Sequence, residues 1–242
     1  MTNPLYYCLR RGQAAAASSA PVATIVTTKV GTFLSTWYGS GTLYFDPGDG
    51  GAVEPLVLTT GGVAWNHSYL SAGSKTIRIT GDLGGITRID CTNVLVADVN
   101  LDHLDVNNCI YLLFQDNNLT TLDKFAHFVN LNGGYFYGNN IVDIKAFAES
   151  IGNYASYRLY LYSNPVVYPL GGIIWKVQTG NTKRLNSIFS TSDEVDRCLI
   201  DLNTALWSGC IIYIDGTNPA PTAAAAAALA GLASRACTVY TN

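Results

Sequence analysis

A short pattern of apolar residues and one asparagine repeats through the middle of the chain. An apolar or small residue is followed two positions later by an apolar residue, three positions after that by asparagine, and then by another apolar residue. The pattern recurs at a step of about 22 residues, and a period of this size is typical of solenoids. The copies are Leu112-x-Phe114-x-x-Asn117-x-Leu119, Gly134-x-Phe136-x-x-Asn139-x-Ile141 and Leu159-x-Leu161-x-x-Asn164-x-Val166.

Each copy predicts one coil of such a solenoid. Side chains alternate sides along a short strand, so apolar residues two positions apart are buried on one face. The chain then turns inward, and the asparagine side chain bonds to backbone groups that the turn leaves unpaired. Stacked coils convert these bonds into a ladder, so we expect Asn117, Asn139 and Asn164 to lie in register.

This pattern resembles the leucine-rich repeat, whose core consensus is LxxLxLxxNxL. The alternation between Ile86 and Val106 and a late copy, Ile212-x-Ile214-x-x-Thr217, extend the resemblance over residues 83–242. The resemblance implies a short solenoid of the kind found in bacterial surface and bacteriophage proteins.

Residues 24–82 give a different signal, with short alternating runs such as TIVTTKV and KTIRIT between glycine-rich turns. These runs predict a small β-sandwich. The segments FDPGDGG and WNHSYLSAGSKTIRITG resemble a polycystic-kidney-disease (PKD) type domain, although Pro47 replaces a frequent aromatic residue. The resemblance implies an extracellular spacer or glycan-associated module without catalysis. The matching residues are Asp46, Gly48, Asp49, Gly50, His67, Tyr69, Gly73, Thr76, Ile77 and Ile79.

Metal binding is the alternative role for several polar residues. Asp46 and Asp49 could ligate calcium, but aspartate readily bonds nearby backbone amides and we favour a role in the turn. His67 is interpreted as a packed, hydrogen-bonded strand residue. Residues 98–102, DVNLD, begin like a calcium-binding EF-hand loop that lacks its later glycine and glutamate. No metal site and no cofactor is therefore predicted.

The C-terminal part predicts a cap that closes the solenoid, in the order helix, strand, helix, strand. Thr191 and Glu194 have the spacing of a capping box at a helix start. Residues 168–190 are hard to interpret, and IIWKV within them predicts an irregular strand. The fold class is thus mainly β with an α/β C-terminal part. The residues expected on one face of the first helix are Val195, Leu199, Leu202 and Leu206.

The six cysteines lie far apart, without the close spacing of metal-binding fingers. Several occupy positions where a small apolar residue would serve, which favours buried free thiols over disulfides. They are Cys8, Cys91, Cys109, Cys198, Cys210 and Cys237.

Tyrosines flank the buried strand positions and give the candidate binding site. Because side chains alternate along a strand, these tyrosines point away from the core, and neighbouring strands lie about 4.8 Å apart. Tyrosine offers apolar area and a hydroxyl group, which suits sugar rings or a protein partner. The alternative is that the rings only stabilise the sheet. The predicted ladder is Tyr135, Tyr137, Tyr160, Tyr162 and Tyr213.

Composition excludes several classes of partner. Only 13% of residues are charged and the net charge is -3, which argues against nucleic acid. No apolar run approaches the roughly 18 residues of a membrane span. Residues 1–23 contain two arginines and then small residues without a leucine-rich centre, so we interpret them as a docking arm and not a secretion signal.

No motif of a nucleophile elbow, phosphate loop or zinc protease occurs in the sequence, and no catalytic residue is predicted. The leading hypothesis is a non-enzymatic bacteriophage virion protein, such as a capsid decoration, head-fibre or tail-associated subunit. It would contact other virion proteins through the arm, form a homo-oligomer in the assembly and present the tyrosines to a host-surface glycan or protein. The alternatives are a bacterial cell-surface adhesin and a polysaccharide-degrading enzyme.

Overall fold

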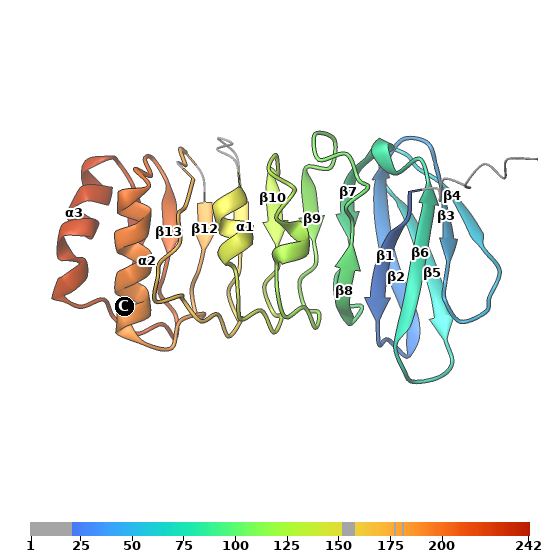
Figure 1. The fold of residues 1–242 in the computed structure, drawn as a ribbon, viewed down its shortest axis with the longest axis horizontal. Coiled ribbons are helices and arrows are strands. Elements are labelled where there is room, and N and C mark those ends of the chain that lie inside the picture. The colour runs from blue at the N-terminus through green and yellow to red at the C-terminus, as the bar shows by residue number, and fades with distance from the viewer. Residues whose placement is uncertain (1–20, 152–157, 177, 181) are drawn as a thin grey trace, which may run out of the picture.

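The chain forms an elongated, β-rich structure built on two sheets, which confirms the predicted β-rich class (Figure 1). Figure 1 shows the first strands gathered at one end of the molecule and the helix α3 at the other. The strand order is β4-β3-β6-β1-β8 in the first sheet and β14-β13-β12-β11-β10-β9-β7-β2-β5 in the second. The computed structural model describes residues 21–151, 158–176, 178–180 and 182–242.

A β-sandwich forms the N-terminal end. One layer is the antiparallel five-stranded sheet, and the other begins with the antiparallel strands β5, β2 and β7. Phe45 stacks on Trp65 with ring centroids 4.7 Å apart, and Trp37 meets Phe45 edge-on at 5.3 Å. The strands are β1 (Ala23–Thr27), β2 (Gly31–Gly39), β3 (Thr42–Asp46), β4 (Glu54–Val57), β5 (Val63–Tyr69), β6 (Lys75–Gly81), β7 (Ile86–Asp90) and β8 (Val96–Asn100).

The predicted docking arm, residues 1–23, lies outside the described residues as far as residue 20. Its last residue, Ala23, already belongs to β1 and is completely buried.

The two aspartates that follow β3 shape the turn between β3 and β4, as the sequence predicts. Asp46 Oδ1 accepts a hydrogen bond from Gly48 N, and Asp49 Oδ1 accepts one from Gly51 N, each at 3.0 Å. Gly48 has a φ of +77°, and a Cβ atom there would lie 2.2 Å from a backbone oxygen of β6. The turn therefore requires glycine at that position.

His67 joins this turn to the strands beside it, in agreement with the role predicted for it. Its Nε2 lies 2.8 Å from Asp49 Oδ2, and its Nδ1 lies 3.3 Å from Glu54 Oε1. Burial lowers the pKa of His67, but the hydrogen bonds to the two carboxylates outweigh burial and hold the pKa above its usual value. The bond to His67 lowers the pKa of Asp49.

Both sheets continue across residues 82 and 83, where the sequence places the boundary between two domains. β7 pairs antiparallel with β2 on one side and parallel with β9 on the other. β8 pairs antiparallel with β1 and completes the five-stranded layer. The buried apolar residues likewise form one core from Ala23 to Cys237. The first coil of the repeat region is thus part of the sandwich.

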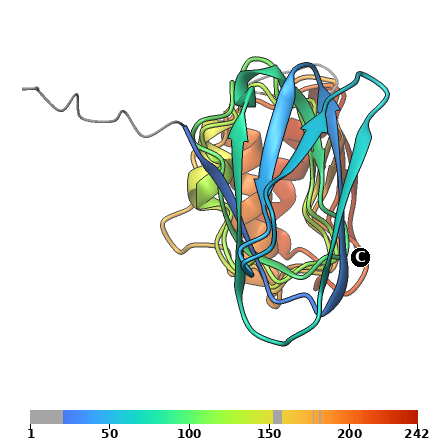
Figure 2. The same ribbon diagram turned by 90° about the vertical axis from the view of Figure 1, so that its right-hand side faces the viewer.

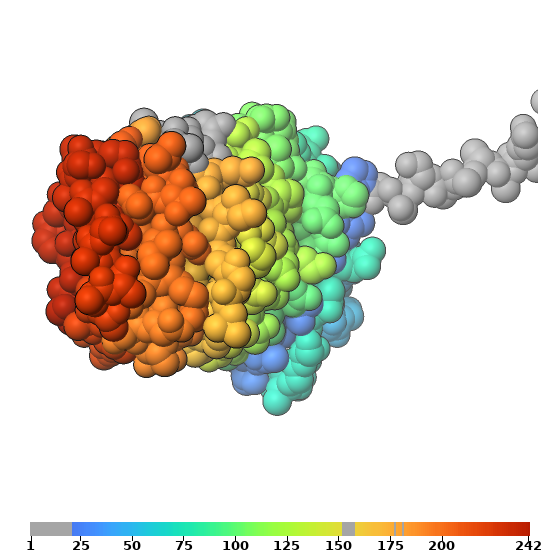
Figure 3. Space-filling view, turned by 60° about the vertical axis from the view of Figure 1, so that its left-hand side comes forward, coloured from blue at the N-terminus to red at the C-terminus, as the bar shows by residue number. Residues whose placement is uncertain are grey.

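Beyond β7 the second sheet is parallel, and each of its short strands belongs to one coil. Seen along the long axis, the coils lie behind one another (Figure 2), and from the side they form successive bands (Figure 3). Leu112 of β9 is level with Gly134, Leu159, Lys183, Ile212 and Val239 of the following strands. These strands are β9 (Tyr111–Leu113), β10 (Gly133–Tyr135), β11 (Arg158–Tyr160), β12 (Thr182–Arg184), β13 (Ile211–Tyr213) and β14 (Thr238–Tyr240).

Helical segments close the other side of the coils. They are the 3₁₀ turns η2 (Asp123–Phe125) and η3 (Ala223–Ala225) and the helices α1 (Lys145–Ser150), α2 (Ser192–Thr204) and α3 (Ala226–Ser234), while a further 3₁₀ turn, η1 (Leu83–Gly85), directly precedes β7. Phenylalanines fill the space between these segments and the strands. Phe125 of η2 lies 5.2 Å from Phe114 and 4.9 Å from Phe136, measured between ring centroids.

The asparagine ladder predicted from the repeat is confirmed. Asn139 Nδ2 donates to Phe114 O of the preceding coil at 2.8 Å and to Phe136 O of its own coil at 2.9 Å, while Oδ1 accepts from Leu119 N at 3.0 Å. Asn117 and Asn164 make the same bonds one coil earlier and one coil later. All three asparagines are buried, so each satisfies backbone groups that water cannot reach.

The late copy differs from the prediction in its asparagine position. Thr217 is exposed, and Asn218 occupies the ladder instead. Asn218 Nδ2 donates to Leu185 O at 2.8 Å and to Ile214 O at 3.0 Å. The turn after β13 contains one more residue than the earlier turns, which shifts the rung by one position.

The strand predicted within IIWKV is wrong for its described residues, 173–176, which form irregular backbone. The strand of this coil is β12, whose inward residue is Lys183. Lys183 is 1% exposed, and its Nζ lies 5.6 Å from the centroid of the Trp207 ring. Burial lowers the pKa of this lysine well below its usual value. Because Lys183 stands where Leu159 and Ile212 stand in β11 and β13, the repeat pattern cannot be recognised in the sequence of this coil.

The C-terminal part follows the predicted order of α2, β13, α3 and β14. The capping box is confirmed, because Thr191 Oγ1 accepts from Glu194 N at 3.2 Å and the Glu194 side chain accepts from Thr191 N at 3.0 Å. The prediction for Leu206 is wrong. It lies beyond α2 with a φ of +58° and is 60% exposed, while Trp207 enters the core.

The C-terminal part is predicted to cap the end of the stacked coils. It does so only on the side of the coils that carries the helices. α3 packs against α2 and β14, but β14 is the last strand of its sheet and pairs only with β13 among the described strands. The solenoid therefore ends in a strand with one free edge within the part of the chain that the structure describes.

Five cysteines are buried free thiols, as predicted, and Cys8 lies outside the described residues. Burial raises the pKa of Cys109 to about 12, so its thiol stays protonated and unreactive at neutral pH. None of the helices in the described part of the chain has the length and apolar character that a membrane crossing requires.

The ladder predicts a specific loss of stability. Replacing Asn139 by alanine leaves buried carbonyl and amide groups unpaired and should lower the free energy of unfolding by about 3 kcal/mol. The neighbouring Asn140 is exposed and makes no side-chain bond within the described part of the chain, so Asn140→Ala should change stability little. Urea unfolding of both variants measures the difference, and equal losses would contradict a ladder role for Asn139.

The His67 network predicts that stability depends on pH. The raised pKa of His67 stabilises the fold fully below the unfolded value of about 6.5, and this contribution is lost as pH rises through the folded value. The lowered pKa of Asp49 contributes above about 3.8 and is lost at lower pH.

Urea midpoints should therefore fall between pH 6 and pH 8, and His67→Gln should remove most of that fall. His103 is exposed, and His103→Gln serves as the control. If the urea midpoint of His67→Gln falls as much between pH 6 and pH 8 as that of the unaltered protein, His67 is not the cause of the pH dependence.

Candidate functional site

The outward face of the parallel sheet holds the candidate site. Leu112, Leu159 and Ile212 point into the core with no exposed surface, so their neighbours along each strand point outward. The structure places all the predicted tyrosines on this face, each partly exposed: Tyr135, Tyr137, Tyr160, Tyr162 and Tyr213.

Four of these rings form one cluster on β10 and β11 and the residues just after them. Tyr135 and Tyr160 meet edge-to-face with centroids 4.9 Å apart. Tyr137 and Tyr162 are nearly parallel and 4.3 Å apart. Tyr160 lies 6.4 Å from Tyr162 and connects the two pairs. Tyr213 does not touch this cluster directly, because β12 lies between β11 and β13.

Arg184 of β12 fills the gap between the rings. Its Cζ lies 5.1 Å from the ring centroid of Tyr160 and 4.9 Å from that of Tyr213, which is cation–π distance on both sides. Tyr213 then stacks on Tyr240 of β14 at 4.8 Å. We use the name tyrosine–arginine file for this row of Tyr135, Tyr160, Arg184, Tyr213 and Tyr240, together with Tyr137 and Tyr162 beside it.

The sequence pattern does not predict Arg184 and Tyr240 as members of this row. The strand predicted for the coil of Arg184 lies in IIWKV instead of β12, and β14 lacks the asparagine of the repeat. A signal for Arg184 was present, since Arg184-Leu185 corresponds to Tyr160-Leu161 one coil earlier.

Neighbouring side chains cover faces of several of these rings. Tyr137 and Tyr162 cover one face of each other, and the Arg184 guanidinium covers one face of Tyr160 and of Tyr213. Each of these four rings thus has at least one face covered by a neighbour, which leaves less flat area for the sugar stacking that the sequence suggests. The Tyr137 and Tyr162 hydroxyl groups are hydrogen-bonded to each other, and the Tyr135 side chain is hydrogen-bonded to Arg158.

The hydroxyl group of Tyr137 keeps its proton at neutral pH. Burial, with a further contribution from Tyr162, raises the pKa of Tyr137 to about 12. A hydrogen bond with Tyr135 raises the pKa of Arg158, an exposed residue of β11. The face thus offers tyrosine hydroxyl groups together with guanidinium groups.

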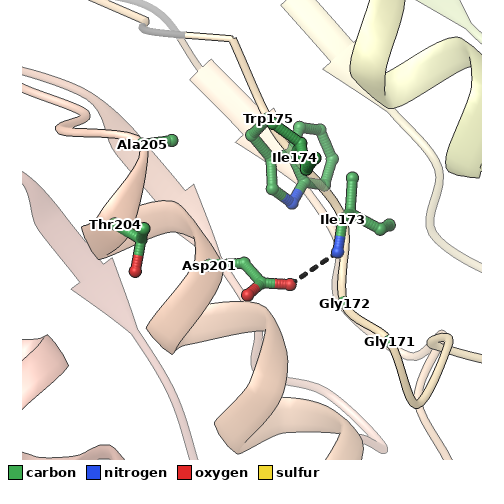
Figure 4. A pocket seen from close by; sticks show the side chains of 8 residues that line it. All are labelled: Gly171, Gly172, Ile173, Ile174, Trp175, Asp201, Thr204 and Ala205. Carbon is green, nitrogen blue, oxygen red and sulfur yellow. Dashed lines mark hydrogen bonds between the residues drawn. The ribbon is translucent and has the colours of Figure 1, made fainter.

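A pocket of about 240 Å³ lies elsewhere, between α2 and the irregular segment 171–175 (Figure 4). Its carboxylate is already bonded, because Asp201 Oδ2 accepts from Ile173 N at 2.7 Å and from the Tyr168 hydroxyl at 2.8 Å. Gly172 has a φ of +71°, and a Cβ atom there would approach that carboxylate to 2.8 Å. The pocket is smaller than the roughly 300–1,000 Å³ usual for ligand sites, and its polar group holds the fold.

No grouping of three or more histidine, cysteine or acidic side chains suited to a metal ion occurs within the described ranges. The Asp46 and Asp49 side chains of the β3–β4 turn are engaged by backbone amides, as described above.

Comparison with known proteins gives little. No family model matches the chain, and no curated protein matches it. Among solved structures, it is similar to an internalin (inlF) from Listeria monocytogenes str. 4b F2365, with 17% sequence identity and a TM-score of 0.32. That similarity covers 66% of this chain and 56% of the internalin chain.

Proposed function

We propose that this chain is a non-enzymatic recognition protein whose outward sheet face binds a surface glycan. The observation that carries the proposal is the tyrosine–arginine file, which runs without a gap across β10 to β14.

An extended glycan fits the direction and chemistry of the file. The side chains repeat from strand to strand at about 4.8 Å, so a chain of sugar units lying across the strands meets a new polar group at each step. Sugar hydroxyl groups need both donors and acceptors, and a tyrosine hydroxyl provides both. Rings held by their neighbours also lose little conformational entropy on binding.

The groups on the three central strands of this face favour binding over hydrolysis. The outward residues on β10, β11 and β12 carry hydroxyl, amide and guanidinium groups, which bind and orient a ligand. Glycoside hydrolysis generally uses a pair of carboxyl groups flanking the scissile bond. The outward residues of these three strands and their following turns are Gly133, Tyr135, Tyr137, Arg158, Tyr160, Tyr162, Thr182, Arg184 and Asn186.

The assignment of the coils to the leucine-rich repeats, and of residues 24–82 to the PKD-type domains, is part of this proposal. The asparagine ladder supports the first assignment. The bonded Asp46–Gly51 turn supports the second, as does Tyr69, whose hydroxyl donates to Pro47 O at 2.8 Å. Both families imply display on an extracellular surface.

We further propose that the protein is displayed on the outside of a bacteriophage particle. The five described cysteines are buried free thiols, which fits folding in the reducing cytoplasm of a host before release by lysis. An adhesin exported through an oxidising compartment is the second candidate and fits these thiols less well.

A double variant, Tyr135→Ser with Tyr160→Ser, should lose at least tenfold in glycan affinity. It should lose only the roughly 0.2–1 kcal/mol of stability that a cross-strand pair contributes. A glycan array and thermal unfolding measure the two effects. Tyr44 is 46% exposed on β3 of the sandwich, and Tyr44→Ser is the matched control. Reduced melting with unchanged binding would show that the rings only stabilise the sheet.

Removal of residues 1–22 should leave the coils folded and abolish incorporation into particles. Mass spectrometry of purified particles measures the copy number, and circular dichroism of the free protein checks the fold. Normal copy number in the truncated protein would refute the docking role of the arm.

A further inference from the structure

We propose that the glycan is acidic, and that Arg158 and Arg184 bind its carboxylate groups. This inference rests on the glycan-binding function proposed above and narrows its ligand class. It depends on three observations: the charge of the face, the way Arg184 is held, and the position of the nearest carboxylates.

The central part of the face carries positive charge alone. Among the outward residues of β10, β11 and β12, the charged side chains are Arg158 and Arg184. Neither forms an ion pair with a carboxylate in the described part of the chain. By contrast, Arg88 pairs with Asp90 at 3.3 Å, and Arg197 pairs with Asp193.

Arg184 is fixed before any ligand binds. The two rings of Tyr160 and Tyr213 hold its guanidinium from both sides. Its Nε atom is buried and has no hydrogen-bond partner among the described residues. The rings attract the cation but accept no conventional hydrogen bond from its N–H groups. Because Arg184 is partly exposed, its guanidinium can still offer an incoming carboxylate a charge-assisted contact at a small entropic cost.

A polar neighbour can receive the sugar beside this carboxylate. Asn186 follows Arg184 on the same outward side and is partly exposed, although its Oδ1 atom is buried without a hydrogen-bond partner within the described residues. Its carboxamide group also has N–H donors, which can bond to a sugar hydroxyl group. Arginine and amide groups in one line match a unit that carries both a carboxylate and hydroxyl groups.

Acidic side chains lie at both ends of this region of the sheet. Asp116 follows β9, and Asp215 follows β13. Asp90 is on β7 and is occupied by Arg88. The carboxylates of an acidic glycan are thus attracted to β11 and β12 and repelled at both ends. The protein's net charge of -3 disfavours long nucleic acids at the same place.

The test is calorimetric titration of the full chain with oligomers of galacturonate, guluronate and sialic acid, each compared with its neutral methyl ester. At least one acid should bind, at least tenfold more tightly than its ester, and more weakly as salt is added. Arg184→Gln and Arg158→Gln should each weaken that binding by roughly ten- to hundredfold. Arg184→Lys should restore only part of the loss.

Arg78 is exposed on β6 of the other sheet, and Arg78→Gln is the matched control. Thermal unfolding confirms that each variant is folded. Equal binding of acid and ester would overturn the acidic ligand while leaving glycan binding intact. Acid binding that survives both glutamine variants would overturn the arginine assignment. Binding of no acid, with neutral glycans bound on the array, overturns this inference alone, and binding of no glycan at all overturns the proposed function as well.

Discussion

The buried carboxamide groups of four asparagines join each of their coils to the coil before it. Every parallel strand from β9 onward has only three residues, so strand pairing alone offers few hydrogen bonds per coil. Each rung adds bonds within the turn and across to the neighbouring turn, in a place that water cannot reach. The packing of phenylalanines against η2 and α1 then fills the space that these turns enclose.

Stacking in register is what turns single outward residues into a surface. A shift of one residue in any strand would send its outward side chain into the core. With the register held, Tyr135, Tyr160 and Arg184 become neighbours although they are far apart in the chain. The coil of β12 departs most from the repeat. It has Ile188 at the ladder position and Lys183 in the core, and it also supplies the central arginine. Departures from local rules are often found at functional positions.

The sequence predicts those parts of the structure that depend on local signals. The asparagine rungs at Asn117, Asn139 and Asn164 and the capping box at Thr191 follow from spacing within a few residues. The joining of the sandwich to the coils could not be foreseen, because β7 and β8 pair with strands about 50 to 75 residues earlier. Asn218 and β12 were missed because an extra turn residue and a buried lysine disguise the repeat. The tyrosine positions were predictable from alternation, but the orientation of the rings depends on contacts between strands.

Hydrogen exchange at the asparagine side chains tests the stacked-coil account most directly. In a native-state NMR experiment, the carboxamide protons of Asn139 should exchange only when the whole coil region unfolds, together with the backbone amides of the adjacent strands. Those of the exposed Asn140 should exchange at the rate of a free side chain. Equally fast exchange at both asparagines would mean that the coils are not joined by a buried ladder. The ladder could then not be what aligns the outward side chains into one face.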